Sequence, residues 1–341
     1  MNKTVKRVAY SEIKNVLSKI LENYGFNSER ADILAGIFAD NNLYGKDSHG
    51  LNRFPVFINS IEKELVDVNA VPEKVKKFQA FEQWDGKLGA GPLNAVICAD
   101  RTMALADENG IGCLALRNTN HWMRGGTYGW RAAERGYFFI CWSNTTPNMP
   151  AWGSDEPRLG NNPLIIAIPK KNGPVVLDMA MSQYSYGSLE VHSKNNEDLS
   201  FEGGYDEKGK LTTNPDDILT TQRTLPAGLW KGAGLALVLD LMAAFLSDGK
   251  SSKAIGDQQD EYGLSQVFIA IKSDVVGSTD ALNKIVEEII SDYHQSKKVE
   301  DNDIYYPGER SMNAFKDRKE NGIPVNISFW NEIKEMAPGT S

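Results

Sequence analysis

The spacing of hydrophobic positions predicts three helices at the start of the chain. Between Ser11, where the first helix begins, and Gly25, where it ends, apolar residues recur with the 3.6-residue period of an amphipathic helix. They are Ile13, Val16, Leu17, Ile20 and Leu21. A second helix is predicted over NSERADILAGIFADNNL with Ser28 as its N-cap, and a third from about Val56 through SIEKELV. The first 66 residues are therefore expected to be mainly helical.

From about residue 78 the pattern changes to short β-rich runs separated by helices. Strands are predicted in IGCLALRN, YFFICWSN, PLIIAIPKK, PVVLDMA and QVFIAIKSD, and helices near 93–108, 232–247 and 279–294. The turn-rich, charged segment 201–217 is interpreted as a long surface loop or an insertion, and the tail VNISFWNEIKEMAPG as helix. This alternation predicts an α/β (α+β) layered fold. We expect a helical region over 1–75, joined by 300–341, and an α/β region over 76–299.

Composition narrows the class of protein. The chain is 41% hydrophobic and 24% charged, as in an ordinary globular protein, and its formal net charge is −8 without an arginine-rich tract. This argues against nucleic acid or an anionic membrane as partner. We see no run of about 18 apolar residues and no secretory leader, so a soluble cytoplasmic protein is expected.

Cysteine and histidine usage gives no metal site. Cys98, Cys113 and Cys141 are odd in number, lack C-x-x-C spacing and lie in apolar surroundings, which favours buried thiols over disulfides or ligands. The four histidines are scattered, and the P-loop, G-x-S-x-G and H-E-x-x-H patterns are missing.

The Rossmann fingerprint G-x-G-x-x-G is also absent. The nearest match, Gly89-Ala-Gly91, lacks the third glycine and does not follow a convincing strand, so it is interpreted as a turn that leads into a helix. A β-carbon at Gly91 is then expected to cost only local stability, on the order of 1 kcal/mol. GAGLALVLDL, from Gly232, is interpreted as the start of a closely packed helix.

The stretch DSHGLNRFP is the best candidate for catalysis. His49 precedes Arg53 by four residues, and on a helix the two side chains would share a face. A histidine, with an ordinary pKa near 6.5, suits proton donation, and an arginine fork suits a carboxylate. The alternatives are a helix-capping or core histidine and a surface ion pair for the arginine.

Further polar, glycine-rich segments lie along the chain. NHWMRGGTYGW brings together His121 and Arg124, and His121 is a candidate for substrate contact or for a structural hydrogen bond. LPAGLWKGAG places Lys231 at a predicted helix start, where it could meet a cofactor phosphate or ribose. WGSDEPRLGNNP and YYPGERSM are polar turns, and each segment alone is more often only a turn. His192 and His294 have no supporting neighbours in the sequence and are interpreted as solvent or packing residues.

Taken together, these segments form an ordered set. DSHGLNRFP, EQWDG, NHWMRGGTYGW, CWSN, LGNNPLIIAIP, LDMAMS, LWKGAGLALVLDL, EYGLSQVFIAI and PGE closely resemble the malate/L-lactate dehydrogenase family of type 2 over nearly the whole chain. The resemblance implies a reductase of 2-oxo or imino acids that uses NADH or NADPH. It also implies a non-Rossmann nucleotide-binding fold with a mixed sheet, which accounts for the missing fingerprint.

The resemblance also assigns residues. It implies that His49 is the proton donor and that the cofactor contacts three segments. These are Pro174, Val175, Val176, Leu177, Asp178, Met179 and Ala180; then Trp230 and Lys231; then Gly308, Glu309 and Arg310. Ala180 and Arg310 stand where a close relative has a serine and a histidine, so backbone contacts are what these two positions retain. Asp178 is expected to anchor the ribose or backbone, or to orient a neighbouring donor.

The predicted function is NADH-linked reduction of a sugar-derived diketo acid by a homodimer whose active site is completed by the partner subunit. Other 2-oxo acids (malate, lactate, ureidoglycolate), an imino acid, or a catalytically silent protein that binds a sugar acid or nucleotide are the alternatives. Tyr128, Trp130 and Trp142 are candidates for an aromatic interface or cleft wall, or for core packing.

Overall fold

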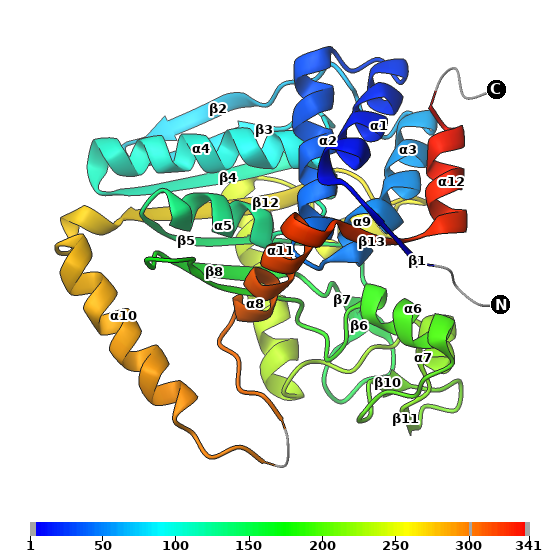
Figure 1. Ribbon diagram of the computed structural model, residues 1–341. Coiled ribbons are helices and arrows are strands. Elements are labelled where there is room, and N and C mark those ends of the chain that lie inside the picture. The colour runs from blue at the N-terminus through cyan, green and yellow to red at the C-terminus, as the bar shows by residue number, and fades with distance from the viewer. Residues whose placement is uncertain (1–4, 300–301, 338–341) are drawn as a thin grey trace.

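A seven-stranded mixed sheet forms the centre of the protein (Figure 1). The computed structural model describes residues 5–299 and 302–337. In order of pairing, the strands are β2 (Glu73–Phe78), β3 (Phe81–Asp85), β4 (Ile111–Thr119), β12 (Leu264–Lys272), β5 (Tyr137–Ser143), β8 (Leu164–Ile168) and β9 (Val175–Met179). Only β3 and β4 pair in parallel within this sheet. Because a Rossmann sheet is mostly parallel, this topology confirms the predicted non-Rossmann α/β fold.

Helices cover both faces of the sheet. Leu114 and Leu116 of β4 pack against α4 and α5, whereas Ala115 between them packs against α8, as the alternation of a strand requires. The helices predicted near 93–108, 232–247 and 279–294 are confirmed. With the short helices beside them, their bounds are α4 (Gly91–Asn109), α5 (Gly126–Glu134), α8 (Trp230–Ser247), α9 (Ser252–Gly256), η3 (Ser273–Val275) and α10 (Thr279–His294).

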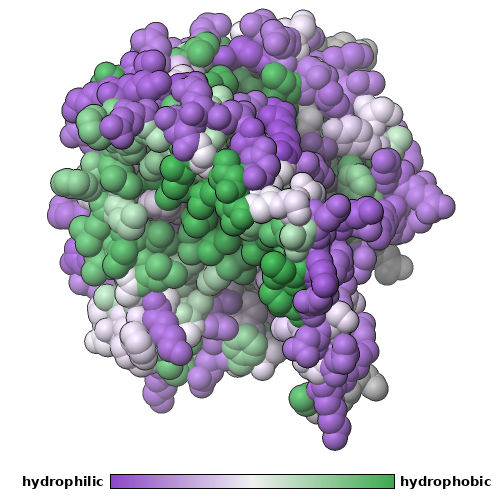
Figure 2. Space-filling model, turned by 90° about the vertical axis from the view of Figure 1, so that its left-hand side faces the viewer, coloured by the Kyte–Doolittle hydropathy of each residue, from purple (hydrophilic) through white to green (hydrophobic). Residues whose placement is uncertain are grey.

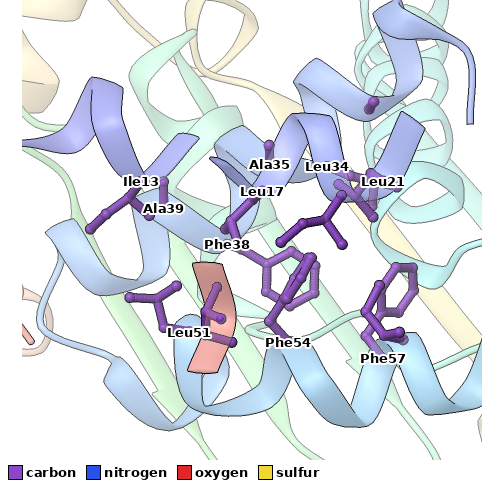
Figure 3. Close-up of a cluster of buried hydrophobic side chains, with 14 of the residues drawn as sticks. Ile13, Leu17, Leu21, Leu34, Ala35, Phe38, Ala39, Leu51, Phe54 and Phe57 are labelled. Carbon is purple, nitrogen blue, oxygen red and sulfur yellow. The ribbon is translucent and has the colours of Figure 1, made fainter. Parts of the chain in front are cut away.

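The three predicted N-terminal helices are present and share one core (Figure 3). They are α1 (Tyr10–Asn23), α2 (Ser28–Leu43) and α3 (Phe54–Glu62). Ile13, Leu17 and Leu21 of α1 are fully buried there, and each contributes roughly 1.5–3 kcal/mol. The N-cap of α2 is Asn27, whose side chain accepts from Arg30 N, and not the predicted Ser28.

The C-terminal part of the chain completes this core. β1 (Val5–Val8) pairs with β13 (Ile323–Asn326), and neither strand was predicted. α11 (Glu309–Asn321) precedes β13 and α12 (Ile327–Glu335) follows it, as the tail pattern predicted for α12. Trp330 and Ile333 of α12 are buried among the N-terminal helices. The boundaries 1–75, 76–299 and 300–341 remain a prediction, and residues 1–4, 300–301 and 338–341 lie outside the described residues.

The segment between β9 and α8 folds on the surface (Figure 1). The predicted loop 201–217 is structured, because it contains two short strands and the start of a helix. Leu189, Leu199 and Ile218 form a small core of their own, so the interpretation as an insertion fits better than a bare loop. The elements of this region are α6 (Tyr186–Asn195), β10 (Gly204–Tyr205), β11 (Leu211–Thr212) and α7 (Pro215–Thr221). Two further short strands, β6 (Met149–Pro150) and β7 (Pro157–Leu159), lie between β5 and β8.

Gly91 is the first residue of α4 and has no room for a side chain. A β-carbon there would lie 2.1 Å from Asn120 O and 2.4 Å from His121 O. Both neighbours are backbone atoms, which cannot rotate away. The expected cost of only about 1 kcal/mol for this β-carbon is therefore wrong, since the glycine lets α4 pack directly on the segment that carries His121.

The helix α8 is, by length and composition, long and apolar enough to cross a membrane, although no apolar run of that kind is expected from the sequence. In the structure one side of it packs on the sheet through Ala233, Ala236 and Ala243. Asp240, in the middle of the helix, accepts hydrogen bonds from Asn144 Nδ2 at 2.9 Å and Ser252 N at 2.8 Å. These contacts are those of a helix that packs within a folded protein.

Candidate active site

Two short 3-10 turns carry the predicted proton donor. η1 (Asp47–His49) and η2 (Leu51–Arg53) follow α2, and the backbone changes direction at Gly50 between them. His49 and Arg53 therefore do not share one helical face, although their spacing predicted that they would. They line two neighbouring cavities instead.

Side chains from two other helices hold this pair of turns. Asn42 of α2 donates from Nδ2 to Asp47 Oδ1 and accepts at Oδ1 from Leu51 N, both at 2.7 Å. A β-carbon at Gly50 would lie 2.1 Å from Asn42 Oδ1, so glycine is required there. From α11, Arg318 donates to Asp47 Oδ1 at 2.7 Å. The catalytic loop thus depends on both ends of the chain.

The imidazole rings of His49 and His121 line one cavity of about 180 Å³. Their centroids are 6.1 Å apart, and the ring planes differ by 12°. Met123 N donates to His121 Nδ1 at 3.0 Å, so this nitrogen is an acceptor and the neutral ring carries its proton on Nε2. Ser48 Oγ lies 3.0 Å from His49 Nδ1. Within the described residues, the Nε2 atoms of both rings have no hydrogen-bond partner and are available to a ligand.

Burial makes both histidines weak bases. Removal from water disfavours the imidazolium and lowers the pKa of His49 to about 4, with Asp178 acting in the opposite direction and Arg53 and Arg124 in the same one. Burial, followed by the charges of Arg53 and His49, also lowers the pKa of His121 well below its usual value. The pKa values of both rings thus lie below the ordinary value near 6.5, which favours the neutral rings in the free protein.

Asp178, on β9, lies between this cavity and a larger one. Arg124 Nε donates to Asp178 Oδ2 at 3.1 Å, and the Arg124 side chain is only 5% exposed. A β-carbon at Gly126 would lie 2.4 Å from the same Oδ2, so this glycine of NHWMRGG lets the carboxylate approach the start of α5. The Asp178 carboxylate favours the protonated His49 ring, whereas the Arg124 guanidinium paired with it acts in the opposite direction.

The larger cavity, of about 560 Å³, lies between β9 and the turn that precedes α11. Val176 N donates to Pro307 O at 2.9 Å and holds these two segments together. Val176, Leu177, Asp178, Gly308 and Arg310 line this cavity, so members of two predicted cofactor segments face one space. It adjoins the histidine cavity, because Lys46, Arg124 and Asp178 line both.

Other predicted cofactor residues lie around this space rather than on its walls. Ala180 lines the histidine cavity. Glu309 fixes the turn: its Oε2 accepts from Tyr306 N at 3.1 Å and pairs with His294 Nε2 at 3.0 Å. Pro174, Val175 and Met179 belong to β9 or adjoin it without lining either cavity.

Trp230 and Lys231 stand apart from both cavities. They are the first two residues of α8, and both are exposed. The loop before them follows the backbone beyond Ala180, since Ala227 N donates to Met181 O at 2.8 Å. Their contact with the cofactor stays a prediction.

Arg53 lines a third cavity, of about 170 Å³, which shares His121 and Met123 with the histidine cavity. Within the described residues, the Arg53 guanidinium has no hydrogen bond and no ion pair. The alternative of a surface ion pair is therefore not what the structure shows, and the guanidinium is free to bind an anion.

A family model described as malate/L-lactate dehydrogenase matches residues 8–334 of this chain. The chain belongs to the malate/L-lactate dehydrogenase family. It is accordingly an NAD(P)-dependent oxidoreductase of the 2-oxo acid type.

Named relatives of this family resemble the chain over its full length. It is 42% identical over 340 residues to 2,3-diketo-L-gulonate reductase of Haemophilus influenzae, covering 97% of this chain and 100% of the relative. It is 41% identical over 333 residues to 2,3-diketo-L-gulonate reductase of Escherichia coli, with the same coverage. The crystal structure of malate dehydrogenase from Entamoeba histolytica superposes with a TM-score of 0.93 at 26% identity, covering 98% of this chain and 97% of that one.

The aromatic residues suggested for an interface lie in the core of this family member. Tyr128, Trp130 and Trp142 are at most 3% exposed, and each packs within its own chain. The cysteines are free, as predicted: Cys98 and Cys141 are buried, and burial raises the pKa of the partly exposed Cys113 to about 11. Their roles are in packing rather than chemistry.

Several residues that line the histidine cavity were not proposed from the sequence. Thr145 and Asn161 come from loops after β5 and β7, and Ser185 is the N-cap of α6. Ser48 lies in DSHGLNRFP beside His49, and Arg124 lies in NHWMRGGTYGW close to His121, so their positions in the sequence are a signal that they belong to the site. The others needed the fold.

Proposed function

We propose that this enzyme reduces the 2-oxo group of 2,3-diketo-L-gulonate with NADH to give 3-dehydro-L-gulonate. The observation that carries the proposal is that the cavity lined by the His49 and His121 rings adjoins the cavity formed by β9 and the turn before α11. The full-length similarity to two reductases of that name supports the choice of substrate. We place the enzyme in the cytoplasm on its composition.

The larger cavity fits a pyridine dinucleotide. Lys46, Arg124 and Arg310 line it and offer positive charge to a diphosphate, and Asp178 can accept from a hydroxyl group. When bound, the nicotinamide supplies the hydride that reduces the carbonyl carbon. The sequence gives no arginine that we can assign to a 2′-phosphate, which is why we propose NADH.

The protein groups divide the remaining work. Arg53 holds the substrate carboxylate and so fixes which carbonyl carbon is presented. The Nε2–H of His121 donates to the carbonyl oxygen and stabilises the charge that grows on it. His49 then gives a proton to the alkoxide, and Asp178 stabilises the imidazolium before that transfer.

The pH dependence follows from the lowered pKa of His49. Reduction needs the protonated ring, whereas the free enzyme holds it neutral above about pH 4. Between about pH 5 and 8, kcat/KM for reduction should fall close to tenfold per pH unit, because this parameter reports groups of the free enzyme. Oxidation of the hydroxy acid uses the neutral ring and should not vary through His49 over that range. Initial rates in both directions measure this, and reduction that stays flat to pH 7 contradicts it.

The decay of NADH absorbance tests the proposed reaction. Purified enzyme is mixed with 2,3-diketo-L-gulonate, pyruvate or oxaloacetate, and with either NADH or NADPH. The expected result is the highest kcat/KM for the diketo acid with NADH. Tight sugar-acid binding without turnover of any 2-oxo acid would instead favour the catalytically silent alternative.

The apolar outer face of α8 supports the homodimer. Trp230, Leu237, Val238, Leu241 and Phe245 recur along one side of this helix, opposite the side that packs on the sheet, and Phe245 is 85% exposed. Hydrophobic side chains also gather across the middle of the face that Figure 2 shows, on the side of the molecule that carries α10. Exposed apolar surface of this extent marks an interaction site, and we propose that a second copy of the chain covers α8.

Charge placed on this face should separate the subunits. In Leu241→Glu/Phe245→Glu, two carboxylates per subunit would be buried without partners, so the dimer Kd should rise by a factor of about 100 or more. Sedimentation velocity measures the change, and circular dichroism checks the fold. Val75→Glu, at an exposed position on β2, is the matched control and should leave the oligomeric state unchanged. A double variant that sediments like the wild type contradicts the α8 interface.

A further inference from the structure

The cavity that Arg53 lines extends beyond the reacting groups. It shares His121 and Met123 with the histidine cavity and continues between α3 and the segment that precedes β12. Lys63 Nζ of α3 and Asp260 Oδ1 of that segment form an ion pair at 2.7 Å among the residues that line it. Of the residues that line this cavity, the proposed reaction uses only Arg53 and His121.

Polar groups that line this cavity lack partners within the described part of the chain. Glu261 accepts from Thr146 N at Oε2 (3.1 Å), while its Oε1 has no donor. Asn120 Nδ2 donates to three backbone carbonyls, whereas Asn120 Oδ1 accepts no hydrogen bond. The Arg53 guanidinium has no acceptor. These donors and acceptors in the cavity lining are therefore available to the polar groups of a ligand.

Another part of the lining is apolar. Phe57, Val66 and Met123 line the same cavity and are each at most 5% exposed. A polyhydroxylated carbon chain matches both kinds of wall, because its C–H groups can lie on apolar side chains while each hydroxyl both donates and accepts. A plain aliphatic chain would leave Glu261 and Asn120 unpaired.

We infer that this cavity is the subsite for the hydroxylated chain beyond the reacting carbonyl, with Glu261 as the acceptor that selects hydroxylated substrates. The inference rests on the proposed function and deepens it. His121, which lines both cavities, and Arg53, which lines this one, hold the carboxylate and carbonyl end. Glu261 binds the hydroxyl groups further along. It is a specificity residue and takes no part in hydride or proton transfer.

The test compares a long and a short substrate. For Glu261→Ala, the ratio of kcat/KM for 2,3-diketo-L-gulonate to that for pyruvate should fall about tenfold or more, through KM of the long substrate. Glu261→Gln keeps a carbonyl acceptor and should fall less. Glu62→Ala is the control: it removes a carboxylate of α3 that accepts from the Tyr24 hydroxyl and does not line the cavity. The ratio should therefore not change. Equal losses for both substrates, or no loss, overturn the subsite.

Direct binding separates this inference from the proposed function. If the wild-type enzyme reduces no 2-oxo acid, the proposed function fails, and calorimetric titration with L-gulonate tests the subsite. Affinity at least about tenfold weaker in Glu261→Ala than in the wild type supports it. Equal affinities, or no binding to either protein, overturn it. Thermal unfolding of each variant verifies that the comparison is made between folded proteins.

Discussion

His49→Ala is expected to lower kcat for reduction by about 10²–10⁴, the range for a lost general acid. The cavity beside β9 does not include His49, so the affinity for NADH should stay close to that of the wild type. The fold should survive the loss of the partly buried ring, because the hydrogen bond between Asn42 and Asp47 still holds the turn that carries residue 49. Steady-state kinetics and a fluorescence titration of NADH measure the two quantities.

His192→Ala is the matched control for this change. His192 lies on α6, and its Nδ1 is 2.9 Å from Ser188 O, one turn earlier in the same helix. It lines none of the three cavities of the site, so its loss should leave kcat unchanged. A folded His49→Ala enzyme with the kcat of the wild type would remove His49 from the mechanism.

Gly91→Ala should lower the free energy of unfolding by about 3 kcal/mol or more, because the new β-carbon meets backbone oxygens at 2.1 and 2.4 Å. Relief of this overlap requires the 120–121 backbone to move. That movement displaces the His121 ring, so kcat should fall as well. Urea denaturation gives the stability, and the NADH assay gives the rate.

Gly36→Ala separates a local clash from a general effect of the substitution. Gly36 lies inside α2, where a β-carbon would meet Lys14 Cε at 3.6 Å, an ordinary contact. Alanine favours a helix over glycine by roughly 1 kcal/mol, so this variant should be at least as stable as the wild type. Equal stability of Gly91→Ala and Gly36→Ala would contradict the packing described for α4.

Long periodic patterns predicted their elements well. α1 and α10 each repeat apolar residues with the helical period over several turns. β1 and β13 were missed because each has four residues, and in β1 only Val8 is buried. No local pattern distinguishes such a strand from a loop, since its pairing partner lies at the other end of the chain.

The site shows the same division between local and distant information. His49 was proposed from its neighbours, but the shared face that a helix would give His49 and Arg53 does not form, because Gly50 separates two turns. The low pKa of His49 depends on burial by elements remote in sequence. Glu261 belongs to EYGLSQVFIAI, one of the segments that resemble the family, but only the fold shows that it lines the same cavity as Arg53.

The pairing of β1 with β13 has a consequence for synthesis on the ribosome. The N-terminal helices emerge first, but Ile323, Trp330 and Ile333, which fill their core, are made only after the last strand of the sheet. Arg318, which holds Asp47, also comes late. The apolar faces of the N-terminal helices that these residues cover therefore stay exposed while the sheet is synthesised. The loop that carries His49 is therefore completed only after the sheet has been synthesised, and a chain released before Arg318 would contain every strand of the sheet but would lack this support for its proton donor.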